Sequence, residues 1–104
     1  MKFEKNVVLT GMRTELLAAL NVADNIWRDF GQELWVTSIA DGKHSTTSLH
    51  YAGSAADLRS HYFLPDVKRK VCNALKRALP KDFDVVQEPT HIHLEFQPRY
   101  PRRS

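Results

Sequence analysis

The chain has a single cysteine, Cys72, and it lacks any long uninterrupted run of apolar residues. One cysteine excludes an internal disulfide, and its place on the apolar side of a predicted helix indicates a small buried hydrophobe rather than a nucleophile or ligand. A membrane-spanning helix needs about 18 or more apolar residues, so no membrane insertion is expected. The apolar run near the N-terminus is also too short for a secretory signal. We therefore expect synthesis in the cytoplasm, and action outside the cell would require release by another agent.

Repeats and low-complexity segments are also missing, and 104 residues suffice for one domain but not two. We assign residues 1–98 to this domain and residues 99–104 to a basic C-terminal tail. The net charge is +3, and its excess lies in that tail and in two clusters, residues 68–70 and 76–77. Basic surfaces attract nucleic acid, anionic membranes or anionic wall polymers. A solvated helix face explains the two clusters better than a binding surface does.

Apolar residues recur at three- and four-residue spacing over residues 13–30, which predicts a first helix that Gly31 is suited to end. Residues 34–39 are rich in β-forming residues and predict a strand. Residues 40–53 are polar and dense in Ser, Thr, Gly and His. They predict a long loop, and long loops in compact domains are often functional.

The second half of the chain predicts a strand at residues 55–58, a helix over 65–79 and two strands near 83–87 and 90–96. Pro65 suits the first turn of the helix. The expected buried stripe of this helix is Val67, Val71, Leu75 and Ala78. Helices and strands in this order predict an α+β domain with a small, mostly antiparallel sheet and two main helices.

Strand alternation places His91, His93 and Glu95 on one face of the last strand, while Ile92 and Leu94 point to the core. Two histidines side by side on the face away from the core suggest the floor of a cleft. Two exposed polar residues are an equally good interpretation of this short pattern. Glu95 either orients an imidazole or is a solvated surface residue, and the second interpretation is favoured.

Asp57 lies in an apolar segment, where an ionised carboxylate is costly unless it is paired or bound to a metal. A salt bridge to a lysine or arginine is the simpler alternative. His50, seven residues earlier across a turn at Gly53, favours a metal. Two imidazoles and one carboxylate form a three-ligand set that suits Zn²⁺, with the fourth position left to water.

The segment over residues 41–58 resembles the metal loop of the M15-type zinc peptidases, which include D-Ala-D-Ala carboxypeptidases and L-Ala-D-Glu endopeptidases. It is most similar to the version in the Hedgehog signalling domain, which shares the zinc fold. The pattern S-x-H-x-x-G-x-A-x-D is carried by Ser48, His50, Gly53, Ala55 and Asp57, and a downstream His-Ile-His accompanies it. The resemblance covers about residues 13–97 and implies a Hedgehog/D-Ala-D-Ala peptidase-like fold.

By this resemblance the zinc ligands are His50, Asp57 and His93. The resemblance also makes Glu88 the general base and places His91 in the site, where it hydrogen-bonds the tetrahedral intermediate. A competing register exists, because Glu88 and His91 also fit the E-x-x-H spacing of some family members, which would make His91 the ligand. We prefer His93, because the Hedgehog-like first motif accompanies the HxH form.

The resemblance implies a zinc-dependent metallopeptidase that hydrolyses peptidoglycan stem peptides, as in a phage-type lysis enzyme. One departure is that many family members carry an arginine where this chain has residues 38–40 (Ser-Ile-Ala), and only Lys43 or His44 suggests itself as a substitute. A non-catalytic zinc module that binds a peptide or protein is therefore the second hypothesis. A basic nucleic-acid-binding domain without metal ranks last, because it leaves the three ligands unexplained.

Overall fold

The computed structural model describes residues 1–40 and 54–97. These residues form a small α+β fold with two helices and a five-stranded mixed sheet. The elements in chain order are β1 (Lys2–Phe3), α1 (Thr14–Asp29), β2 (Trp35–Ala40), β3 (Ala55–Arg59), α2 (Pro65–Ala78), β4 (Phe83–Gln87) and β5 (His91–Phe96). The predicted class, with two main helices and a mostly antiparallel sheet, is confirmed in this coarse form.

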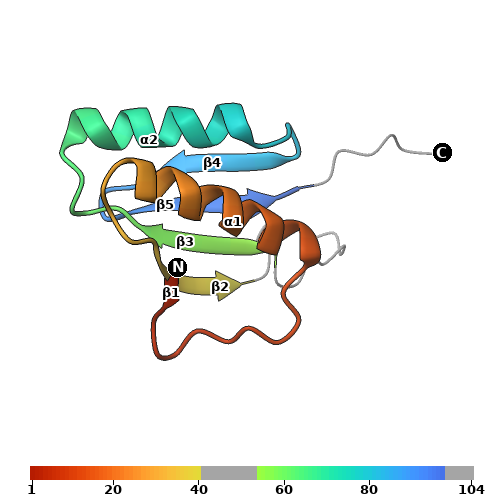
Figure 1. The fold of residues 1–104 in the computed structure, drawn as a ribbon. Coiled ribbons are helices and arrows are strands. Elements are labelled where there is room, and N and C mark those ends of the chain that lie inside the picture. The colour runs from red at the N-terminus through yellow and green to blue at the C-terminus, as the bar shows by residue number, and fades with distance from the viewer. Residues whose placement is uncertain (41–53, 98–104) are drawn as a thin grey trace.

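The sheet has the strand order β1-β2-β3-β5-β4 (Figure 1). The β2–β3, β3–β5 and β4–β5 pairs are antiparallel, and β1 pairs with β2 in parallel. A register shift interrupts the β2–β3 ladder between Val36 and Ser38. The two-residue β1 was not predicted, because so short a segment carries no periodic pattern.

Both helices pack on the same face of the sheet, where their apolar stripes meet the strands in one hydrophobic core (Figure 1). α2 contacts β4, α1 contacts β5, and the two helices contact each other. The fully buried core residues of the helices are Leu16, Leu20, Ala23, Trp27, Val71 and Leu75. The strands meet them with Val36, Leu58, Ile92 and Leu94. The opposite face of the sheet is thus left for polar side chains.

The helix ends follow from local chemistry. Gly31 has a φ of +82°, a conformation that favours glycine, and it follows the end of α1 as expected. α2 begins at Pro65, whose fixed φ suits a first helical turn, and ends two residues before Pro80. The predicted stripe of α2 is wrong at Ala78, which is exposed, because the last turn of the helix extends past the core.

The predicted strands agree with β2, β3, β4 and β5 to within one residue at each end. Residue 40, which was predicted to begin the long loop, is the last residue of β2 because it pairs with Ala55. The rest of that loop, including His50, and the basic tail at 99–104 lie outside the described residues. Neither helix in the described ranges is long and apolar enough to cross a membrane.

Candidate metal site on the sheet face opposite the helices

Two neighbouring strands carry three of the predicted site residues, Asp57, His91 and His93, to the sheet face opposite the helices. In the antiparallel β3–β5 ladder Asp57 stands directly across from His93, and Arg59 stands across from His91. The residues between them, Ala56, Leu58, Ile92 and Leu94, are buried in the core on the helix side. Because side chains alternate along a strand, Asp57, His91 and His93 all project from the opposite face. The prediction from strand alternation is confirmed.

Asp57 is the centre of this group, and each of its oxygens has a polar neighbour. Oδ1 lies 2.7 Å from Nδ1 of His93 and 3.6 Å from Nε2 of His91. Oδ2 accepts a hydrogen bond of 3.0 Å from the Ser38 hydroxyl on β2. The first distance is a hydrogen bond and the second is too long for one. Two imidazoles therefore converge on one carboxylate oxygen, and a serine fixes the other.

His93 lies between two carboxylates. Its Nδ1 faces Asp57, and its Nε2 lies 3.0 Å from Oε1 of Glu95. Burial alone would lower the pKa of His93, but the hydrogen bonds and negative charges of Glu95 and Asp57 outweigh it and raise the pKa above its ordinary value. The arrangement therefore favours a protonated imidazole whose two N–H groups donate to the two acids.

Glu95 is only 4% exposed, so the interpretation of this residue as solvated surface is wrong. Besides His93, it contacts Gln97, whose side-chain amide donates to Oε2 at 2.9 Å. An ionised carboxylate loses hydration when it is buried, and charge-assisted hydrogen bonds offset that cost. Strand alternation correctly placed Glu95 on the histidine face but carries no information on how deeply that face is covered.

Glu88 and His91 occupy the two ends of the turn that joins β4 to β5. The backbone N–H of Glu88 donates to the carbonyl of His91 at 2.9 Å, which brings the two residues side by side. Lys68 of α2 closes the turn from the core side, because its Nζ donates to the carbonyls of Glu88 and Pro89. This lysine is buried, so the interpretation of residues 68–70 as a solvated face is wrong at residue 68.

The donor types in this cluster fit part of a zinc site. Carboxylate oxygen and imidazole nitrogen are both common zinc donors. Asp57 and His93 supply one of each, since Oδ1 of Asp57 lies beside Nδ1 of His93. Within residues 1–40 and 54–97, no three His, Cys, Asp or Glu side chains are arranged so that they could hold a metal ion together. Two of the three expected ligands are thus in contact, and the third, His50, lies outside the described residues.

Sequence reasoning missed two residues beside this cluster. Ser38 occupies the register position opposite Asp57 and donates a hydrogen bond to its carboxylate, which orients a predicted ligand. Arg59 follows Asp57 by two residues on β3 and so shares its face. Its guanidinium lies 5.1 Å from the centre of the Trp35 ring and pairs with Glu4. The same alternation that placed the histidines would have indicated Arg59.

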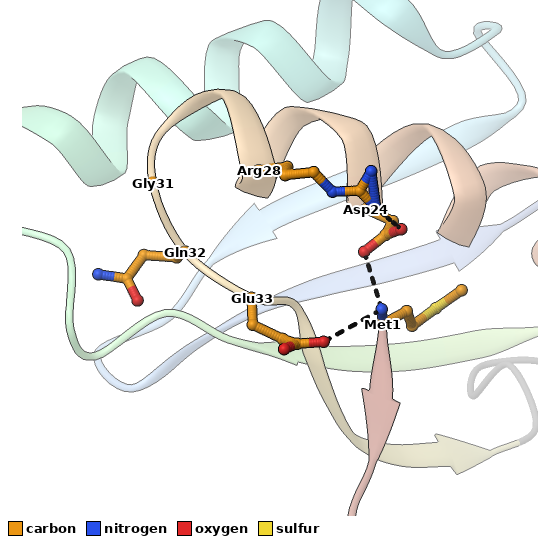
Figure 2. A pocket seen from close by; sticks show the side chains of 6 residues that line it. All are labelled: Met1, Asp24, Arg28, Gly31, Gln32 and Glu33. Carbon is orange, nitrogen blue, oxygen red and sulfur yellow. Dashed lines mark hydrogen bonds and ion pairs between the residues drawn. The ribbon is translucent and has the colours of Figure 1, made fainter.

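A hollow of about 330 Å³ elsewhere in the molecule is lined by Met1, Asp24, Arg28, Gly31, Gln32 and Glu33 (Figure 2). Its charged groups pair with one another: the N-terminal ammonium contacts Asp24 at 3.1 Å and Glu33 at 3.4 Å. Burial alone would raise the pKa of Asp24, but the ammonium and Arg28 outweigh it and lower the pKa. These internal pairs give the hollow a structural explanation.

Comparison of the sequence with protein-family models and with curated proteins finds no match. The resemblance to the M15-type peptidases therefore rests on the motif residues themselves and on the geometry of those that are described.

Proposed function

We propose that this chain is a zinc-dependent metallopeptidase that hydrolyses peptidoglycan stem peptides, of the D-Ala-D-Ala carboxypeptidase or L-Ala-D-Glu endopeptidase type, with a Hedgehog/D-Ala-D-Ala peptidase-like fold. The observation that carries the proposal is the contact between Asp57 and His93, 2.7 Å from Oδ1 to Nδ1. These two residues come from separate motifs 36 positions apart in the chain. Two side chains that bind one metal ion must lie near each other in the folded chain, and these two do.

In this proposal His50, Asp57 and His93 hold the zinc ion. A bound zinc ion lowers the pKa of a water to about 7 and polarises a carbonyl. Glu88 accepts a proton from the attacking water and passes it to the departing amine. In this proposal His91, whose Nε2 lies 3.6 Å from Oδ1 of Asp57, donates a hydrogen bond to the oxyanion. Ser38 keeps Asp57 oriented throughout.

Arg59 offers a role that the sequence pattern left open. A guanidinium on the same face as the proposed ligands supplies a cationic group that recognises a peptide carboxylate. Stacking on Trp35 and pairing with Glu4 hold it in one orientation. Stem peptides carry free carboxylates, so Arg59 provides a chemical reason for this substrate class.

The test is to incubate the zinc-loaded protein with purified peptidoglycan and to measure new amino termini and released D-alanine over a range of pH. The peptidase proposal predicts one of these products, and absence of both at every pH would contradict it. Glu88→Gln should lower turnover by about 100-fold or more while zinc content stays unchanged. His61→Ala, a change at an exposed histidine, is the matched control and should retain turnover.

The second candidate is a non-catalytic zinc module that binds a peptide or protein. The observation in its favour is that residues 38–40 (Ser-Ile-Ala) stand where many peptidases of the family that the chain resembles have an arginine. Glu88→Gln separates the two candidates, because a binding module should keep its affinity for its partner in this variant. Loss of product formation with retained zinc favours the peptidase.

A further inference from the structure

Glu95 is a buried charged residue whose burial the proposed reaction does not explain. It lies on β5 two residues after His93, on the same face, and is 4% exposed. Burying a carboxylate costs several kcal/mol unless hydrogen bonds compensate it. A side chain retained at such a cost commonly holds another group in place. The contacts of Glu95 therefore indicate its role.

His93 is that group, because Oε1 of Glu95 lies 3.0 Å from its Nε2. The other carboxylate oxygen, Oε2, accepts a hydrogen bond of 2.9 Å from the side-chain amide of Gln97. Gln97 is anchored in turn by its backbone N–H, which donates to the carbonyl of Asp82 at 2.6 Å. The carboxylate is thereby fixed from the β4 side, and its free rotation is restricted. Glu95 therefore presents a fixed acceptor to one nitrogen of the imidazole.

The two nitrogens of His93 then have different roles. Nδ1 faces Asp57, the other predicted ligand, and Nε2 faces Glu95. A histidine that binds a metal through one nitrogen usually donates its other N–H to a carboxylate or carbonyl, which fixes the tautomer and raises the basicity of the ligand nitrogen. Glu95 occupies the place of that acceptor.

We propose that Glu95 is a positioning residue, which keeps the proton of His93 on Nε2 and directs the Nδ1 lone pair to the Asp57 side, where the metal binds. The proposal rests on the proposed function, because it requires Asp57 and His93 to be zinc ligands. Nδ1 of His93 is then the atom that binds the metal. Glu95 acts through His93 and contacts neither the metal nor the substrate.

The experiment measures zinc affinity by competition with a chelating dye for the full chain, Glu95→Ala and Glu95→Gln. Glu95→Ala should weaken affinity by about 10- to 100-fold, the usual effect of losing such an acceptor. Glu95→Gln keeps an uncharged acceptor and should lose less. Glu15→Gln, at a half-exposed position on α1, is the matched control and should bind zinc as the unaltered chain does.

A second readout separates positioning from a merely structural role. Nitrogen-15 NMR of the zinc-loaded protein should show His93 with its proton on Nε2 in the unaltered chain and in Glu95→Gln. Glu95→Ala should show a fraction of His93 bound to zinc through Nε2 instead, with its proton on Nδ1. Unchanged zinc affinity in both Glu95 variants would overturn the inference and leave the proposed function intact. An unaltered chain that takes up no zinc would overturn both.

Discussion

At the residue scale, the central feature is an imidazole held between two acids. His93 contacts Asp57 through one nitrogen and Glu95 through the other, and these contacts raise its pKa although burial opposes the change. In the metal-free chain the three side chains satisfy one another. Binding of a metal at Nδ1 requires the loss of one proton and of the contact with Asp57, so metal uptake should release protons.

This geometry predicts the pH dependence of stability in the metal-free protein. Because the pKa of His93 is higher in the folded chain than in the unfolded one, protonation of His93 stabilises the fold. The contribution is complete below the ordinary value of 6.5 and is lost as the pH rises through the raised pKa. Urea unfolding with a chelator present should therefore give a lower free energy of unfolding above that range than below it.

The variant His93→Gln should lose this part of the pH dependence, because glutamine does not titrate. His61→Ala is the control and should keep it. The same fall in stability for the unaltered chain and for His93→Gln would show that another group is responsible. Asp24 does not contribute to this change in stability. Because its pKa is lowered by folding, it affects the free energy of unfolding only in acid, near and below its ordinary pKa of 3.8.

The sequence pattern correctly predicted which face of the sheet the side chains of β5 occupy, and it failed to predict how deeply that face is buried. The alternation of strand residues correctly put His91, His93 and Glu95 on one face, because side chains of a strand alternate whatever surrounds them. The burial of Glu95 depends on its neighbours across the sheet and on the Gln97 amide, and these come together only in the folded chain.

At the element scale, the β4–β5 turn is tied to α2 by a single buried lysine. Lys68 is 6% exposed, and its Nζ donates to two turn carbonyls, those of Glu88 and Pro89. This role of Lys68 was not predictable from its neighbours, because it stands in a run of three basic residues that resembles a solvated helix face. The contact places the proposed general base next to His91.

Lys68→Met should lower the free energy of unfolding by about 1–3 kcal/mol, because the buried carbonyls lose their donor while the apolar volume is roughly kept. Urea unfolding measures this difference. Lys70→Met, at an exposed position of the same helix, is the matched control and should change stability by less than about 0.5 kcal/mol. Equal stability of the two variants would contradict the role assigned to Lys68.

The helix and strand positions were largely predictable because each element has a strong local pattern. Residues 13–30 show helical spacing and end at a glycine with positive φ, and α2 begins at a proline. β1 was missed because it has only two residues, which pair with Trp35 and Val36 far along the chain, and so short a segment shows no periodic pattern. Ala78 at the end of α2 was predicted to be buried but is exposed, because helical periodicity does not show how far along the helix the core extends.

At the scale of the whole molecule, the sheet has two different faces. Both helices cover one face (Figure 1), where they form the core with the apolar strand residues, and Asp57, His91 and His93 project from the other. The sheet connects the two, because Asp57 and His93 alternate with fully buried neighbours such as Leu58 and Ile92. A ligand that binds only the folded chain therefore stabilises all of it.

The most direct test of the account is the metal content of the purified protein after dialysis, measured by elemental analysis. We predict about one zinc ion per chain, lost in Asp57→Ala and in His93→Ala and retained in Asp66→Ala and His61→Ala, whose altered side chains are exposed. Zinc at 100 times its dissociation constant should also add about 2.7 kcal/mol to the free energy of unfolding. A chain without zinc, or with equal zinc in all four variants, would contradict the account.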